Sequence, residues 1–267
     1  IPALNENAIT PEKLALGKAL FFDPRLSASG VFSCYSCHNL TTGGDDNMEP
    51  SVGHGWQKGP RNAPTVLNSV LNEAQFWDGR ASSLAAQVAG PVHDPNAMGS
   101  NWAEILEKLN KDSALSTEFK SVYRDGATAR NIADALSSFQ RTWITPNARF
   151  DRHLRGEKNV HSTDELRGSQ LFKSYGCVAC HQGVNVGGNM FQTLGALRSV
   201  RGVLDCSSFG SACHVSVTDD GPDETGLAEA LRSAGIEGCD VRRMTPGIED
   251  CFIRLSSSAA EGSSGAE

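Results

Sequence analysis

The fold of this chain is decided by the stretch Cys34-Tyr35-Ser36-Cys37-His38 and by its counterpart Cys177-Val178-Ala179-Cys180-His181. In each stretch two cysteines are separated by two residues, and a histidine follows the second cysteine directly. A helical pattern precedes each stretch and a Gly-rich segment follows it, so the chain contains a coarse internal repeat. The other cysteines have no common spacing; they are Cys206, Cys213, Cys239 and Cys251.

The spacing within the two stretches has a chemical reason. Two thiols at this separation can each form a thioether with a vinyl group of one haem, and the adjacent imidazole is then held below the iron as its proximal ligand. A zinc or redox CxxC motif with an accidental histidine is the alternative. Because the pattern occurs twice in the same context, we expect two covalently bound c-type haems. Their attachment residues would be Cys34, Cys37 and His38, and Cys177, Cys180 and His181.

Length and composition are those of a soluble globular protein of one large or two ordinary domains, with 267 residues and no apolar run long enough to span a membrane. A net charge of -7 argues against nucleic-acid binding and permits attraction to a small basic partner. The first six residues contain no Met, basic region or apolar stretch, so export would mean that a signal peptide has already been removed.

The pattern of apolar residues predicts helices joined by long loops. Residues 27–66 are rich in Gly, Ser, Asn and Pro, and a loop of that length inside a domain suggests chain wrapped around a cofactor. Strand-like alternation is scarce, so the predicted class is all-α, with two cytochrome c-like haem domains at residues 1–150 and 151–267. Helices are expected at 11–22, 81–90, 101–124 (broken), 128–144 and, after the capping box Ser162–Glu165, up to Tyr175.

Two further residues are ambiguous from pattern alone. His54 lies between Gly53 and Gly55, a flexible setting that suits an iron ligand able to swing away, although a lone histidine on a loop is equally a solvated surface residue. From the sequence pattern alone, Trp77 is predicted to be an ordinary aromatic residue of the core. The remaining histidines are expected to have no ligand role; they are His93, His153, His161 and His214.

Several longer segments resemble the bacterial di-haem cytochrome c peroxidase family. The likeness extends in order over about residues 10–195, and its motifs are long enough to be specific. The segments that carry it are Leu16–Ser27, Gly53–Asn68, Gln75–Arg80, Thr145-Pro146, Phe150-Asp151 and Cys177–Gly188.

This resemblance implies roles in a first, low-potential haem site. The haem bound at His38 would be the peroxidatic one, and His54 would be its second ligand in the resting oxidised form, which must leave before peroxide binds. Gln87 would be a polar residue of the peroxide pocket. Trp77 would lie between the haems on the electron path, and Asn62 would be a ligand of a calcium ion that links the two halves.

The resemblance also implies the reaction and the partners. The haem bound at His181 would be the high-potential one, taking electrons from a small cytochrome c or copper protein, and the two haems together would reduce hydrogen peroxide to water. A periplasmic location and a homodimer are implied as well. A MauG-like oxidase acting on a partner protein, a non-enzymatic electron carrier and a haem-binding but inactive product are the alternatives. A Met opposite His181 would favour the peroxidase and a Tyr the MauG type.

The chain departs from the family pattern in two places. Ala97 stands where the family has a glutamate that serves as acid/base, and the nearby carboxylate of Asp94 is its potential substitute. After Leu197 the likeness stops, and residues 198–267 are rich in Ser and Gly with no sustained periodicity. We expect this segment to bury little apolar surface, and its abrupt change of pattern suggests a reading-frame shift. The second ligand opposite His181 is therefore unassigned; the methionines available are Met48, Met98, Met190 and Met244.

Overall fold

A computed structural model describes residues 9–179, 181, 183–209, 212–236, 239–248 and 250. The chain forms two compact units, the first from residues 1–175 with 183–186 and the second from 176–182 with 187–267. The boundary expected near residue 150 falls inside the first unit. No helix among the described residues combines the length and the apolar character needed to cross a bilayer.

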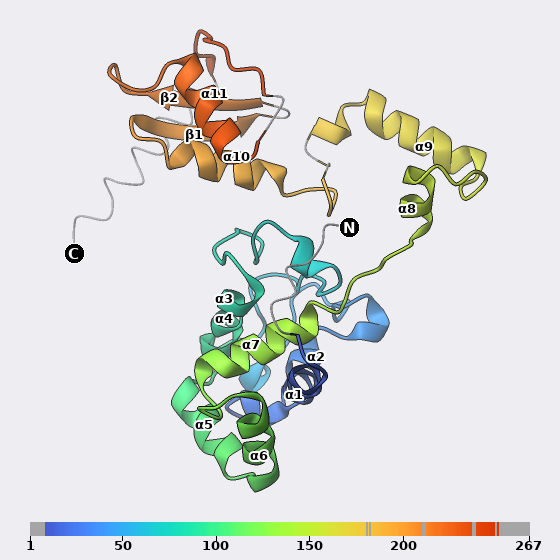
Figure 1. The fold of residues 1–267 in the computed structure, drawn as a ribbon, viewed down its shortest axis with the longest axis vertical. Coiled ribbons are helices and arrows are strands. Elements are labelled where there is room, and N and C mark those ends of the chain that lie inside the picture. The colour runs from blue at the N-terminus through green and yellow to red at the C-terminus, as the bar shows by residue number, and fades with distance from the viewer. Residues whose placement is uncertain are drawn as a thin grey trace. The chain divides into compact units, whose positions relative to one another are not determined.

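Short and medium helices joined by long loops make up the first unit (Figure 1). α1 begins after Thr10, whose hydroxyl accepts the Lys13 N–H, and Pro11 occupies its first turn. The expected helix over 101–124 is broken into α5 and α6, where Asp112 caps the second piece. The helices of this unit are α1 Pro11–Phe21, α2 Cys34–Cys37, α3 Leu84–Gln87, α4 Ala89–His93, α5 Trp102–Asn110, α6 Ser113–Val122, α7 Ala129–Gln140, α8 Arg149–Leu154 and α9 Thr163–Ser174.

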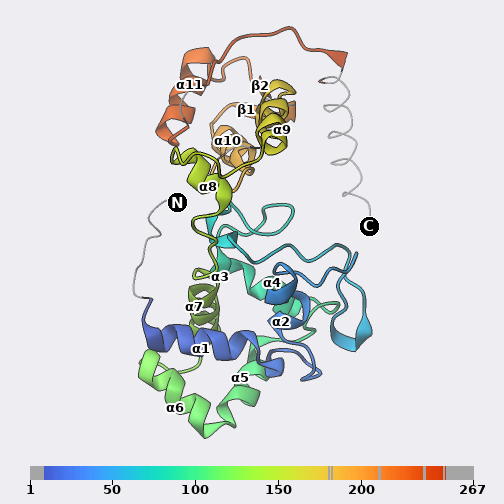
Figure 2. The same cartoon turned by 90° about the vertical axis from the view of Figure 1, so that its right-hand side faces the viewer.

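The core of the first unit is built on the crossing of α1 and α7, seen from two sides in Figures 1 and 2. Leu16 and Leu20 of α1 and Ile132 of α7 are fully buried there. Gly17 allows the close approach, because a Cβ at this position would lie 2.1 Å from the carbonyl oxygen of Ala135. The expected apolar face of α7 is confirmed, and this packed layer is the support on which the loops of the site rest.

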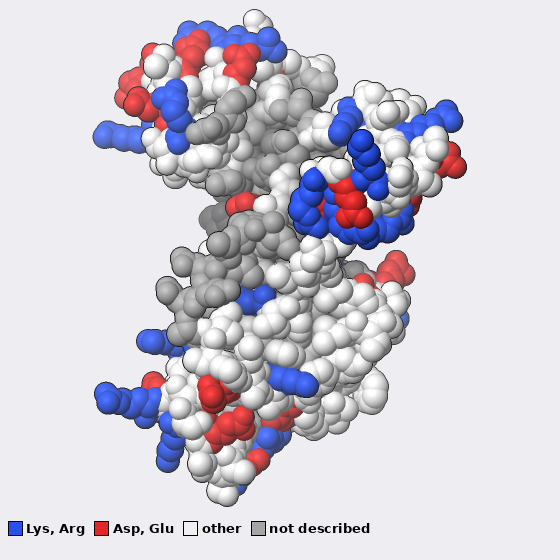
Figure 3. Space-filling view, turned by 45° about the vertical axis from the view of Figure 1, so that its right-hand side comes forward, with Lys and Arg blue, Asp and Glu red and all other residues white. Residues whose placement is uncertain are grey.

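α8 and α9 carry many charged side chains, with Lys and Arg beside Asp and Glu on the face shown in Figure 3. The capping box at the start of α9 is formed as predicted: the Ser162 hydroxyl accepts the Glu165 N–H, and the Glu165 carboxylate accepts the Ser162 N–H at 2.7 Å. Arg149 pairs with the same carboxylate, so the two helices are joined by an ion pair. The backbone and Arg149 hydrogen bonds lower the pKa of Glu165 to about 2.

The second unit corrects the expected fold class. It contains an antiparallel hairpin in which Cys206 lies opposite Val215, so the chain is helix-rich but not all-α. Its described part also has a core, with Leu197, Cys206, Leu227 and Leu231 all buried. This core is small, because only these four hydrophobic residues of the described part are buried in it. Its elements are α10 Asn189–Arg198, β1 Val203–Phe209, β2 Ala212–Val217 and α11 Glu224–Ser233.

Candidate functional site

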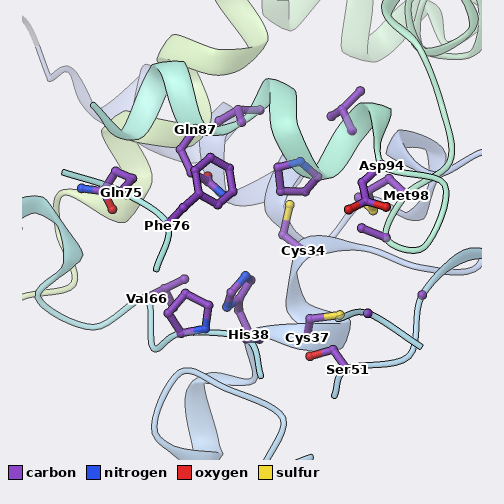
Figure 4. A pocket seen from close by; sticks show the side chains of 18 of the residues that line it. Cys34, Cys37, His38, Ser51, Val66, Gln75, Phe76, Gln87, Asp94 and Met98 are labelled. Carbon is purple, nitrogen blue, oxygen red and sulfur yellow. The ribbon is translucent and has the colours of Figure 1, made fainter. Parts of the chain in front are cut away.

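The first CxxCH motif is held in a tight local turn. α2 begins at Cys34, and the Ser33 N–H donates to the Ser36 hydroxyl at 3.0 Å. The His38 N–H donates to the Cys34 carbonyl oxygen at 3.0 Å, which closes the turn. Both thiols and the imidazole consequently line one cavity of the first unit (Figure 4).

Apolar side chains form most of this cavity, and they come from segments far apart in the sequence. Figure 4 shows the His38 ring below Phe76 and Gln87, with the Cys34 sulfur to the right of the space that separates them. A mainly apolar cavity with a few converging polar groups is the usual form of a cofactor site. Its lining includes Phe21, Leu26, Phe32, Val66, Leu84, Val88, Pro91, Val92, Met98 and Leu136.

The protonation states around the motif follow from its burial. Burial is the main cause that raises the pKa of Cys34, to about 12, and burial also raises the pKa of Cys37. Burial lowers the pKa of His38, which favours the neutral imidazole that metals bind. Its Nδ1 lies 3.4 Å from the Gly44 carbonyl oxygen, the kind of partner that orients a ligating histidine and leaves Nε2 for the metal.

The cavity fits a covalently bound haem by the chemistry of its donor set. Two thiols that can form two thioethers line this cavity, and so does the imidazole of His38. Apolar side chains cover most of the rest of the surface, as a porphyrin requires. Cys34, Cys37 and His38 would hold the group, which when bound would supply redox chemistry at an iron atom.

Gln87 lines the cavity from the end of α3. Ala97 and Asp94 line the same cavity. Met98 is buried in the core of this unit, where it packs among apolar side chains. The loop that carries these last three residues is therefore part of the cavity wall.

His54 lies beside the cavity and does not line it. Its backbone N–H donates to the Ala97 carbonyl oxygen at 2.7 Å, so the loop that carries it is fastened to the cavity wall. The imidazole packs on Gly99, where an added Cβ would be 2.6 Å from the ring. Its Nδ1 is buried without a hydrogen-bond partner in the described part of the chain. This position leaves the space opposite His38 free of the His54 side chain.

Trp77 is 58% exposed, so the interpretation of it as a core residue is wrong. Its side chain lies on the surface of the first unit because Phe76, not Trp77, turns inward. The Trp77 indole N–H donates to the Asn62 carbonyl oxygen at 2.9 Å, and the Asn62 amide donates to the Met48 carbonyl oxygen at 2.8 Å. No group of three or more His, Cys, Asp or Glu side chains suited to a metal occurs among the described residues.

The second CxxCH motif repeats the local turn of the first. Cys177–Ala179 form a 3₁₀ turn, and the His181 N–H donates to the Cys177 carbonyl oxygen at 2.9 Å. The same bond, from the histidine to the first cysteine, closes the motif at Cys34. Cys180 lies outside the described residues. The two motifs therefore share the backbone hydrogen bond that closes the turn before the histidine.

Phe76 and Arg61 also line the cavity, and sequence reasoning did not single them out. Phe76 has a φ of 69°, a conformation that a bulky residue rarely adopts, and no sequence signal announces it. Its ring packs on Gly90, where a Cβ would come within 2.6 Å, and it stacks under the Arg80 guanidinium at 3.6 Å. These contacts turn Phe76 toward the cavity.

A helical unit in which a CxxCH motif faces an apolar cavity is the arrangement that a haem site requires. The comparison with known families makes this more specific, because a family model for di-haem cytochrome c peroxidase matches residues 11–159. The chain belongs to the di-haem cytochrome c peroxidase family.

Curated relatives carry the same likeness. The chain is 51% identical to cytochrome c551 peroxidase of Nitrosomonas europaea over 196 residues, covering 72% of this chain and 58% of that protein. It is 49% identical to cytochrome c peroxidase Ccp of Escherichia coli, covering 69% of this chain and 40% of that protein. It is 41% identical to the methylamine utilization protein MauG of Methylorubrum extorquens, covering 68% of this chain and 52% of that protein. The chain thus spans 40–58% of the length of these relatives.

Solved structures resemble the fold. A MauG-like protein associated with microbial copper homeostasis has a TM-score of 0.60 at 30% identity, covering 68% of this chain and 55% of that chain. The diheme peroxidase BthA from Burkholderia thailandensis has a TM-score of 0.56 at 24% identity, covering 91% of this chain and 67% of that chain. The second likeness concerns the fold alone.

Proposed function

We propose that this chain is a c-type di-haem peroxidase that reduces hydrogen peroxide to water with electrons from a small redox protein. The observation that carries the proposal is the cavity in which Cys34, Cys37 and His38 meet Gln87, while the His54 side chain lies outside it. A haem bound there would have its second axial position accessible to a small molecule. The family, and relatives named as cytochrome c peroxidases, support the same conclusion.

The second haem would be attached at Cys177, Cys180 and His181. Reduction of one peroxide takes two electrons, whereas a small cytochrome or copper protein supplies one, so a second haem stores the other electron. A Met opposite His181 would raise the potential of that haem and direct electrons toward the first site. Met244 is half-exposed in the second unit and is a candidate for this ligand.

His54 and Trp77 would control access and electron delivery. The His54 loop has glycine on both sides of the histidine, and the orphaned Nδ1 gives the ring no strong hold in its packed position. We propose that the ring binds the iron in the oxidised resting state and leaves on reduction. Trp77, exposed on the first unit, would take part in the electron path between the haems.

The remaining proposals come from the family likeness. A calcium ion at Asn62 would have to draw on amide and backbone oxygens, since acidic side chains do not cluster there in the described residues. Attachment of haem to CxxCH motifs and the likeness to bacterial peroxidases support a periplasmic location. A homodimer is proposed on the same likeness.

A MauG-like oxidation of a partner protein is the second candidate. It is favoured by the 41% identity to MauG of Methylorubrum extorquens and by the absence of a glutamate at Ala97. The ligand opposite His181 distinguishes the two functions, and the near-infrared and magnetic spectra of the holoprotein identify that ligand. A methionine supports the peroxidase, and a tyrosine supports the MauG-like oxidase.

The proposal is tested by peroxide turnover of the purified holoprotein before and after one-electron reduction, with its visible spectrum recorded. We expect two haems per chain, little turnover in the oxidised protein and turnover after reduction. Two haems with no peroxide consumption in either state would contradict the peroxidase.

A further inference from the structure

The cavity of the first unit is lined by few side chains that can ionise. In the described part of the chain they are Cys34, Cys37, His38, Arg61 and Asp94. The other polar residues on its walls are Gln, Asn, Ser and Thr, which do not exchange protons near neutral pH. Any proton transfer by a side chain in this cavity must therefore use one of those five groups.

Four of the five are excluded by their chemistry. If the proposed function holds, both thiols are consumed as thioethers and the His38 imidazole is bound to iron. The Arg61 guanidinium does not give up its proton in a protein. Asp94 is the one carboxylate among the described lining residues, and it is the group that remains.

Asp94 is held in a fixed turn at the end of α4. Its Oδ1 accepts the Asn96 N–H at 2.8 Å, and its carbonyl oxygen accepts the N–H groups of Ala97 at 3.0 Å and Gly99 at 2.9 Å. These bonds orient the carboxylate without using both of its oxygens. The residue is half-buried, and Figure 4 shows it beside Met98 on the cavity wall.

We propose that Asp94 is a catalytic residue of this chain, the acid/base for peroxide reduction. Its carboxylate takes the proton from one peroxide oxygen and delivers it to the other, which departs as water when the O–O bond breaks. The oxygen left behind takes up two electrons, one from each of two donor molecules, and two protons from solvent, and it leaves as the second water. The sum is H₂O₂ + 2 e⁻ + 2 H⁺ → 2 H₂O, and Asp94 ends in its starting state.

The test is the substitution Asp94→Asn in the holoprotein. An asparagine Oδ1 can still accept the Asn96 N–H, so the turn is kept while proton transfer is lost. We expect kcat for peroxide to fall about 100-fold or more, at unchanged haem content. Asp46→Asn is the matched control: Asp46 also accepts an N–H two residues on, from Met48 at 3.1 Å, and its charge acts on Cys37, yet it does not line the cavity. This control should turn over peroxide like the parent protein.

A second readout does not depend on turnover. Binding of cyanide to ferric iron requires a base to take the proton of HCN, so the cyanide association rate of the reduced-activated protein is followed by visible absorbance against pH. Asp94→Asn should slow association and change its dependence on pH, and Asp46→Asn should do neither. Adding Ala97→Glu to Asp94→Asn places a carboxylate on the same wall and should restore both properties.

The outcomes separate this inference from the proposed function. A parent protein without peroxide turnover would overturn the peroxidase itself. An active parent whose Asp94→Asn variant keeps its turnover and its cyanide pH profile would overturn only the role of Asp94.

Discussion

At the scale of single residues, the site depends on where one imidazole can lie. His54 rests on Gly99, whose φ of +59° and close contact leave no room for a side chain. The bond from the His54 N–H to the Ala97 carbonyl oxygen holds the backbone nearby, but nothing among the described residues accepts or donates at Nδ1. The packed position of the ring is thus set by the shape of its surroundings rather than by a polar partner.

The substitution Gly99→Ala should therefore displace His54. Its Cβ would lie 2.6 Å from the ring, so the ring must leave the position it has in the structure. If His54 is the resting ligand of the first haem, a larger fraction of that haem stays low-spin after one-electron reduction, and peroxide turnover falls. Electron paramagnetic resonance of the half-reduced protein measures this fraction.

Gly30→Ala is the control for backbone strain. Gly30 has a similar φ of +66° and no heavy atom within 4 Å of an added Cβ, so this variant carries the strain without the clash. It should keep the parent spectrum. Identical spin states in the Gly99→Ala and parent proteins would argue against a mobile His54.

At the scale of elements, α1 and α7 support the cavity through their close crossing. The approach is possible because position 17 has no side chain, and the neighbouring residues of α1 are fully buried. Leu136 of α7 belongs to this core and also lines the cavity, so the packing and the site share a residue. A change at the crossing should reach the haem site through α7.

Gly17→Ala should destabilise the first unit by about 1–3 kcal/mol, because its Cβ would meet Ala135 backbone at 2.1 Å and the helices must move apart. Gly168→Ala in α9 is the matched control, since no heavy atom lies within 4 Å of its added Cβ. That helix should gain about 0.5–1 kcal/mol from better propensity. Urea unfolding of both holoprotein variants measures the two changes in the free energy of unfolding. A Gly17→Ala variant no less stable than the Gly168→Ala variant would contradict the close crossing of α1 and α7.

At the scale of the whole molecule, the two units have separate cores. The first core contains residues from α1, α5, α6 and α7, and the second contains residues from α10, β1 and α11. No residue in the described part of the chain belongs to both. Unfolding should then not be a single two-state transition.

Substitutions in the two cores should consequently act on different transitions. Leu231→Ala, at a position 4% exposed, should lower the stability of the second unit by about 2–5 kcal/mol and leave the first transition unchanged. Leu109→Ala, at a position 1% exposed, should lower the stability of the first unit and leave the transition of the second unit unchanged. Denaturation followed by both far-ultraviolet circular dichroism and haem absorbance separates them. A single transition shifted equally by both variants would show that the units unfold together.

The second unit also bears on the hypothesis of a reading-frame shift after Leu197. Its hairpin and α11 contribute three buried residues to a small core: Cys206, Leu227 and Leu231. Resequencing the coding DNA tests the hypothesis directly, and a read that confirms residues 198–267 would remove it.

The local chemistry of this protein was readable from the sequence because it depends on residues close together in the chain. The CxxCH spacing, the proline and threonine at the start of α1 and the capping box of α9 act over three or four residues, and the structure contains each turn or helix they predict. A break was also expected within 101–124, and the structure places it between α5 and α6, where Asp112 caps the second helix.

Only the tertiary structure decided how distant segments meet. Trp77 is exposed and Phe76 faces the cavity because of a positive φ and of contacts with Gly90 and Arg80, which no local pattern expresses. The position of His54 depends on the loop after α4, more than 40 residues away in the chain. The hairpin of the second unit arises from pairing and burial, which outweigh its weak strand pattern. Contacts of this kind are set by packing in three dimensions, and packing is what the sequence pattern leaves open.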